Sequence, residues 1–369
     1  MSFSNIDKPS KYFNTLTYTG DASSPRTVTG VGFKPDFTWI KNRTRAGSSA
    51  LNDNVRGVGT GVYRELSSET TNNEGNNGGS GYGYLSAFAS DGFTLTTGST
   101  AYDIVNRSGD SYVSWNWLAD NTSGSSNTQG SITSTVSANT TSGFSIVSYT
   151  GTGTTAKTVG HGLGVAPAMI IIKNRSAVTD WRVYHKSLGV NGTYPNFLEL
   201  DLTTASNAGD SGNFASVPTS SVFGVGNYNV VNGNGNSMIA YCFADVKGFS
   251  KFGSYTGNGS ADGTFIYTGF KPAWVMVKCS SNPDEDWIIF DNKRNDFNGL
   301  TKRIMANLNN SEGTDSAEFD FVSNGFKCRY ASSNRSNASG RTYIYMCFAE
   351  NPFCSSKVIP TTARWSGLS

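Results

Sequence analysis

The feature that most constrains this sequence is a twelve-residue phrase that occurs three times. Each copy opens on a glycine, has a proline at its fourth position and carries a lysine six residues after that proline. The copies read GFKPDFTWIKNR, GVAPAMIIIKNR and GFKPAWVMVKCS, at residues 32–43, 164–175 and 269–280. Repetition of this kind is typical of a chain built from copies of one structural unit.

Two further landmarks accompany each copy in the same order. A Tyr-Thr-Gly lies upstream, at residues 18–20, 149–151 and 255–257, and an apolar segment lies downstream, at residues 112–119, 238–245 and 343–350. We therefore divide the chain into an N-terminal arm (1–11), module 1 (12–119), a polar Ser/Thr/Asn-rich linker (120–142), module 2 (143–247), module 3 (248–350) and a C-terminal tail (351–369). Modules 2 and 3 abut and are expected to form a rigid pair, with module 1 placed more independently.

Each module reads as a set of short strands. Brief apolar segments alternate with clusters of Gly, Asn, Ser and Thr, which favour turns. Asp91-Gly92 and Asn324-Gly325 are dipeptides typical of hairpin turns, because such turns require positive φ. The sequence predicts an all-β protein of three tandem, internally similar β-sandwich modules with few or no helices. The Gly- and Asn-rich stretch 67–83 is expected to form a long exposed loop.

The strand inside each repeated phrase is apolar on both faces. One face carries bulky residues such as Phe37 and Trp39, and the other carries mostly β-branched residues such as Ile40. A strand of this kind is covered on both sides. The second cover could be a loop of the same module, a neighbouring module or another subunit.

The recurring lysines Lys41, Lys173 and Lys278 suggest a structural device, because a catalytic group is seldom needed three times in one chain. We expect each to mark the exposed end of its strand and to pair with an acid such as Asp180 or Asp286. Exposed pairs contribute under about 1 kcal/mol. A Lys173→Met substitution is therefore expected to leave fold and assembly intact.

Few residues suggest catalysis. His161 lies in a glycine turn and His185 in a strand pattern, and no nucleophile motif accompanies either. Glycoside cleavage requires two carboxylates, and the candidates are Asp180, Asp201, Asp286 and Asp291. We predict no catalytic residue, no cofactor-binding residue and no metal ligand, and we expect a protein that is not an enzyme.

The Asp-Trp pairs at 180–181 and 286–287 occupy the same position in modules 2 and 3. The preferred interpretation is a turn residue followed by a core anchor. The alternative is a tryptophan that stacks on a sugar beside a hydrogen-bonding aspartate. The five cysteines lack metal-ligand spacing, and the sequence predicts buried reduced thiols; they are Cys242, Cys279, Cys328, Cys347 and Cys354.

The charge pattern excludes several partner classes. With 29 basic and 27 acidic residues the net charge is only +2, and no basic stripe for nucleic acid is present. No apolar stretch approaches the roughly 18 residues of a membrane span, and the N-terminus lacks a signal-peptide core. We therefore expect no nucleic-acid partner and no membrane insertion.

Several segments resemble a repeat domain of virion proteins from tailed bacteriophages, often labelled tail fibre or structural protein. They are YTGNGSADGTFIYTGFKPAWVMVK, KNRSAVTDWRVYHKSLG, NSMIAYCFADVKGFSKFGSYTGNG and the terminal PTTAR. The resemblance runs from about Tyr12 to Arg364. Module 1 departs most from it, because it has DNVRG at 53–57 and lacks the Asp-Trp pair.

The resemblance implies a non-enzymatic structural component of a tailed-phage particle, made in the host cytoplasm and located in the virion. A tail fibre or other surface appendage is favoured. The alternatives are a capsid decoration protein and a carbohydrate-binding or depolymerising receptor-recognition protein. The expected partners are other virion proteins, further copies of the chain in a homo-oligomer, with a trimer favoured, and a host surface glycan. The arm at 1–11 is a candidate attachment segment.

Overall fold

The computed structural model describes residues 4, 6–76, 80–101, 103–295, 297–331 and 333–352. Strands dominate this part of the chain, numbered β1 to β26, and its helical elements are one 3-10 turn, η1 (Pro9–Lys11), and one short helix, α1 (Asn229–Asn232). The predicted all-β class is confirmed. The modules below keep the boundaries predicted from the sequence, and Cys354 and the PTTAR segment lie outside the described residues.

Three antiparallel sheets share one strand order, in which the first strand of a module pairs with its last, the last pairs with the third, and the third pairs with the fourth. In module 1 the strands are β1 (Phe13–Thr19), β7 (Ser111–Trp117), β3 (Phe37–Asn42) and β4 (Ala50–Asp53). In module 2 they are β10 (Phe144–Thr150), β18 (Ser237–Phe243), β12 (Met169–Asn174) and β13 (Arg182–His185). In module 3 they are β19 (Ser250–Thr256), β26 (Thr342–Pro352), β21 (Phe270–Cys279) and β22 (Ile288–Asp291).

A second layer of strands lies against each of these sheets. In module 1 it is β2 (Arg26–Thr29), β6 (Gly92–Thr96) and β5 (Tyr84–Ala89), and in module 2 it includes β11 (Lys157–Gly160) and β17 (Val222–Val225). In module 3 the main sheet continues through β23 (Leu300–Met305), β24 (Gly313–Val322), β25 (Gly325–Cys328) and β20 (Phe265–Tyr267) and curls around its own apolar interior. Module 2 also has β14 (Val190–Asn191), β15 (Tyr194–Pro195) and β16 (Phe197–Glu199).

The structure differs from the linker prediction for residues 120–142. This segment forms β8 (Ser125–Asn127) and β9 (Ser134–Asn139), which extend the sheet of module 2 beyond β10. Val136 lies opposite Val147 of β10, and Ile132 packs into the interior of module 2. Alternating Ser, Thr and Val suit a strand with one buried face, so a composition that suggested a linker also suits a sheet edge.

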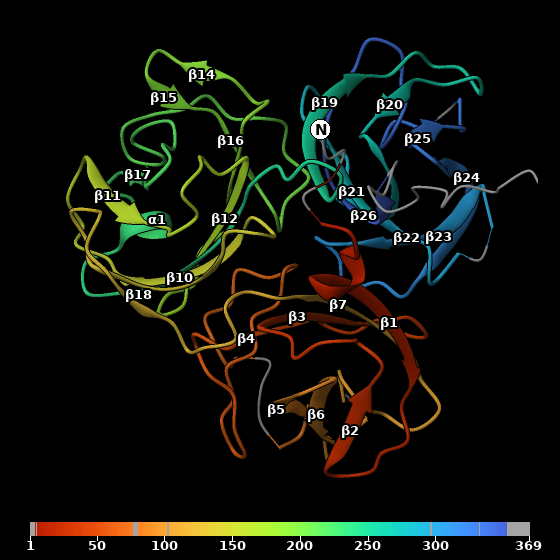
Figure 1. Ribbon diagram of the computed structural model, residues 1–369, viewed down its shortest axis with the longest axis horizontal. Helices are drawn as coiled ribbons and strands as arrows, with labels where there is room; N and C mark the ends of the chain where they lie inside the picture. The colour runs from red at the N-terminus through yellow and green to blue at the C-terminus, as the bar shows by residue number, and fades with distance from the viewer. Residues whose placement is uncertain are drawn as a thin grey trace, which may run out of the picture.

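The three modules surround a common centre (Figure 1). Each has an apolar interior of its own, and a fourth cluster takes residues from all three modules. Ile6 of the N-terminal arm also belongs to this shared cluster. Module 1 therefore packs against both other modules, and the expected rigid pair of modules 2 and 3 with a looser module 1 is wrong.

The shared cluster explains the strand that is apolar on both faces. On β3, Ile40 points into the interior of module 1, whereas Phe37 and Trp39 point into the shared cluster. On β12 and β21 the same alternation places Ile171 and Met276 in the shared cluster. The second cover is therefore the neighbouring modules of the same chain.

Candidate functional site

The recurring lysines lie at the contacts between modules. Lys41, Lys173 and Lys278 are each 0% exposed, so the prediction that they mark exposed strand ends is wrong. Within the described residues none of them forms an ion pair, and Asp286 pairs with Arg335 at 3.5 Å instead. The apolar pattern before each lysine correctly predicts a buried strand. The burial extends to the lysine itself because the neighbouring module covers the end of that strand.

Each ammonium group donates one hydrogen bond within its module and one to a neighbouring module. The acceptors within the module are the carbonyl oxygens of Gly47, Thr179 and Glu285, for Lys41, Lys173 and Lys278 in turn. Across the contacts, Lys41 donates to Leu308 at 2.9 Å, Lys173 to Thr71 at 2.9 Å and Lys278 to Thr203 at 3.0 Å. Module 1 thus bonds to module 3, module 2 to module 1 and module 3 to module 2, and the ring is closed.

A backbone hydrogen bond also repeats at the three contacts, and it is donated in the direction opposite to the lysine bond. The amide of Glu74 donates to the carbonyl of Arg175 at 3.0 Å, that of Glu312 to Arg43 at 3.0 Å, and that of Ser206 to Ser280 at 2.8 Å. Part of the stretch 67–83, which was expected to form an exposed loop, takes part in the contact between modules 1 and 2. Residues 67–74 supply several acceptors there and lie against module 2. The contacts therefore use main-chain groups that all three copies possess.

Burial lowers the pKa of all three lysines, to about 8 for Lys173 and for Lys278. The cause is the cost of a charged ammonium group away from water. Nearby acids, Asp201 and Asp180 among them, partly oppose the shift at Lys173. Each contact therefore holds a lysine whose charge is costly and which donates two hydrogen bonds to main-chain carbonyls.

Two of the three contacts also contain a buried arginine network. In module 1 Arg56 pairs with Asp53 and, at 3.0 Å, with Glu74, which binds Arg175 of module 2 through two hydrogen bonds. Module 3 repeats this arrangement with Arg294, Asp291 and Glu312, and Arg43 of module 1 is the partner. The repeated D-N-x-R at 53–56 and 291–294 is the sequence signal for these networks, although the sequence alone did not reveal their role.

The third contact, between modules 2 and 3, replaces the aspartate by His185. His185 lies opposite Met169, as Asp53 lies opposite Phe37. Its Nδ1 accepts from the amide of Ser187 at 3.2 Å, so Nε2 carries the hydrogen and donates to the carbonyl of Tyr345 at 3.1 Å. Burial lowers its pKa to about 4, so the ring is neutral at pH 7.

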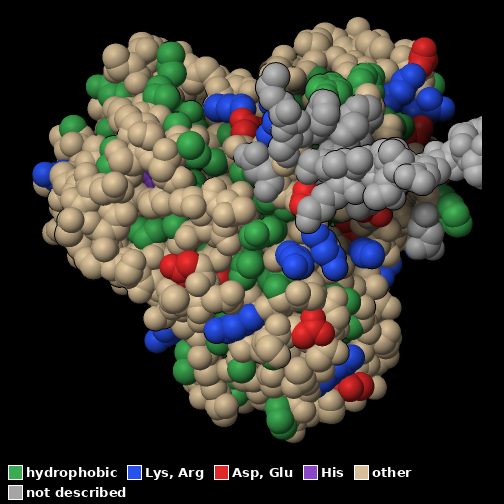
Figure 2. Space-filling view, viewed as in Figure 1, with side chains coloured by type: hydrophobic (Ala, Val, Ile, Leu, Met, Phe, Trp, Pro, Cys, Tyr) green, Lys and Arg blue, Asp and Glu red, His purple; other side chains and the backbone are tan. Residues whose placement is uncertain are grey.

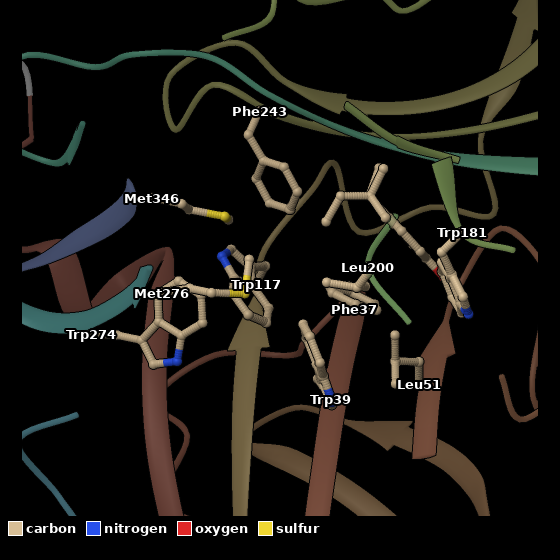
Figure 3. Close-up of a pocket in the computed structure, with 12 residues that line it drawn as sticks. Phe37, Trp39, Leu51, Trp117, Trp181, Leu200, Phe243, Trp274, Met276 and Met346 are labelled. Carbon is tan, nitrogen blue, oxygen red and sulfur yellow. The ribbon is translucent and has the colours of Figure 1, made fainter. Parts of the chain in front are cut away.

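The shared apolar cluster occupies the centre of the ring. Trp117, Phe243 and Trp274 converge there from three different sheets (Figure 3). Phe348 contacts rings from all three modules, including Phe13 at a centroid distance of 4.7 Å. The free volume among these side chains is about 10 Å³, space for one water molecule at most, so the centre is a packed core.

The remaining residues singled out in the sequence have structural positions. His161 is buried and donates to the carbonyl of Thr219 at 3.2 Å, and the tryptophans of both Asp-Trp pairs are buried. Trp181 donates to Ser67 of module 1, and Trp287 to Glu199 of module 2, which supports the core-anchor interpretation. Four cysteines are free and buried, as predicted: Cys242, Cys279, Cys328 and Cys347.

Among the carboxylates considered for glycoside cleavage, burial and then the nearby Asp180 raise the pKa of Asp201 to about 6, but Asp201 is itself buried. Asp291 is fully buried beside Arg294, and Asp201 accepts from the amide of Trp181 at 2.9 Å. Within the described residues no group of three or more His, Cys, Asp or Glu side chains could hold a metal ion. In the same part of the chain no helix is long and apolar enough to cross a membrane.

A cleft of about 450 Å³ lies between the end of module 2 and the β20–β21 turn of module 3. Its lining combines the ring of Tyr267 with the charged groups of Asp245, Lys247 and Lys251. On the face shown in Figure 2, charged side chains of both signs are scattered among mostly uncharged ones. The sequence did not single out this cleft, because its walls come from two modules.

Comparison with known proteins places the chain in a family. No curated protein and no solved structure matches the chain. A family model described as "Domain of unknown function (DUF7483)" matches residues 8–352. The match includes all three modules and the segment between modules 1 and 2. The chain therefore belongs to the DUF7483 family.

Proposed function

We propose that this chain is a non-enzymatic structural component of a tailed-phage particle, in a tail fibre or other surface appendage. The sequence resemblance supplies the class of particle. The observation that carries the structural role is the closed ring, in which the recurring lysines and arginines hydrogen-bond and pair across the contacts between modules. Polar groups that recur in this way serve assembly of the fold.

The side chains most often used in catalysis support a non-enzymatic role. Both histidines are buried, with both ring nitrogens engaged by main-chain groups. Burial raises the pKa of the thiols of Cys242, Cys328 and Cys347, which disfavours the nucleophilic thiolate. These groups are poorly placed to act as base or nucleophile.

The proposed partners are other virion proteins, and the proposed location is the phage particle. A homotrimer is now proposed from the resemblance alone. The apolar strand face that also suggested packing between subunits is covered within the chain. The three modules already provide a threefold arrangement in one polypeptide. Assembly would then use the outer surfaces of the ring.

The test is to locate the chain in purified particles. Mass spectrometry of the particles made by the genome that encodes it should detect the chain, and gold-labelled antibody should mark the tail or its appendages in electron micrographs. Label over the head would favour the capsid decoration alternative. Absence of the chain from particles that carry the other structural proteins would refute the proposal.

A further inference from the structure

Two exposed aromatic side chains of module 3 have no aromatic counterpart at the equivalent positions of its sister modules. Phe265 and Tyr267 of β20 are 45% and 61% exposed, and Ile266 between them is buried. The strand therefore presents two rings on its outer face, about 7 Å apart along the chain. Large exposed aromatics on a fold that is otherwise well packed call for an explanation.

The equivalent positions of modules 1 and 2 show which residues the fold uses there when no aromatic is present. Strand β2 of module 1 pairs Val28 with Phe93 as β20 pairs Ile266 with Phe326, so Thr27 and Thr29 correspond to the two aromatics. In module 2 the corresponding residues are Thr158 and Gly160, beside Val159. The fold is thus built twice without rings at these positions, and the aromatics of module 3 are not needed for it.

Tyr267 is held with one side of its ring beside the backbone. Gly269 has φ of +84°, and a Cβ at this residue would lie 3.6 Å from the tyrosine hydroxyl oxygen and 3.8 Å from Cζ. These are ordinary van der Waals distances, so the ring lies in contact range of the turn. The ring is therefore positioned by the turn while most of its surface remains open to solvent.

The cleft beside Tyr267 offers hydrogen-bonding groups around this platform. Oδ1 of Asp245 accepts from the amide of Phe252 at 2.9 Å and Oδ2 binds Lys186, which fixes the carboxylate and leaves it further acceptor capacity. Lys251 lines the same cleft and forms no ion pair within the described residues. A volume of about 450 Å³ is in the range of small-ligand sites.

We propose that this cleft binds a saccharide, with Tyr267 stacking on a sugar ring and Asp245 and Lys251 hydrogen-bonding to its hydroxyl groups. Phe265 extends the platform to a neighbouring sugar unit. A flat apolar ring beside a carboxylate and an amine matches a sugar, which has an apolar face and a rim of hydroxyls. A docking surface for protein would bury a larger area than this small concave cleft provides.

The test measures binding of defined oligosaccharides to the full chain by microarray and isothermal titration calorimetry. The panel contains neutral hexose, N-acetylhexosamine and uronic-acid oligomers. We expect at least one to bind with Kd below about 1 mM. Tyr267→Thr, which installs the residue that module 1 has, should weaken binding at least tenfold, and Phe265→Thr should weaken it about threefold.

Tyr228→Thr is the matched control, since Tyr228 is an exposed tyrosine of module 2 and does not line the cleft. It should leave affinity unchanged, and all three variants should melt within a few degrees of the wild type. The proposal is overturned if no oligosaccharide of the panel binds, if binding survives Tyr267→Thr, or if Tyr228→Thr weakens it equally. None of these results depends on where the chain lies in a particle, so the proposed structural role is tested separately.

Discussion

Replacing Lys278 by methionine tests whether the buried lysines hold the ring together. The substitution keeps most of the side-chain length and removes the ammonium group that donates hydrogen bonds to the carbonyls of Thr203 and Glu285. Within the described residues no other hydrogen bond reaches either oxygen. The contact between modules 2 and 3 would thus contain two acceptors without donors, a buried one at Glu285 and a partly buried one at Thr203.

The magnitude follows from two opposing contributions. Two unpaired carbonyls of this kind cost roughly 2–6 kcal/mol together. Methionine also avoids the burial of charge. With a pKa near 8 in the folded state, Lys278 lowers the free energy of unfolding of the wild type through its protonation equilibrium. This cost is about 3 kcal/mol at pH 7 and about 1.5 kcal/mol at pH 9.5. Because the folded-state pKa is lowered, the stability that Lys278 contributes to the wild type rises with pH. The deficit of the variant should therefore grow by about 2 kcal/mol between pH 7 and pH 9.5.

The assay is urea unfolding of wild type and variant at both pH values, monitored by tryptophan fluorescence. Titration of thiols and tyrosines is common to both proteins and cancels in the difference. Lys271→Met is the control on the same strand, because Lys271 is partly exposed and pairs with Glu350 at 2.7 Å; it should change stability by under about 1 kcal/mol at either pH. A Lys278→Met variant as stable as wild type at pH 9.5, with a deficit that does not grow with pH, would refute the reasoning.

Three further predictions concern the core, a histidine and the thiols. Phe348→Ala should destabilise the protein by about 3–5 kcal/mol in urea unfolding, because it opens a cavity among rings of three modules, whereas the exposed Val178→Ala should change stability little. His185 has a folded-state pKa of about 4, below its unfolded value, so stability should fall by up to about 3 kcal/mol as pH drops from 6.5 towards 4, and His185→Gln should lose that part of the dependence; an unchanged acid profile would contradict the assignment. The buried thiols should react with Ellman's reagent only after unfolding, and rapid reaction of the native protein with more than one thiol would contradict their burial; they are Cys242, Cys279, Cys328 and Cys347.

The sequence predicted the features that depend on local pattern. Period-two alternation and turn dipeptides gave the strand class, and the triple phrase located β3, β12 and β21. The two apolar faces of these strands correctly predicted that each strand is covered on both sides. A neighbouring module was one of the three structures considered for the second side. These inferences succeed because side-chain direction in a strand follows from residue order alone.

The errors arise where a distant part of the chain completes a local pattern. A lysine after an apolar run normally meets water, but Leu308, which lies 267 residues after Lys41, supplies one of its acceptors. The segment 120–142 lacks aromatics and suggested a linker, yet sheet pairing beside β10 gives it regular structure. The cleft at Tyr267 was missed for the same reason, because two modules form its walls.

The central claim is that three modules of one chain share a single core and close into a ring. Differential scanning calorimetry of the wild-type chain tests it most directly. Shared burial and cyclic hydrogen bonds predict one cooperative transition with equal calorimetric and van't Hoff enthalpies. Two or three separate transitions, each with the enthalpy of about one module, would contradict the account.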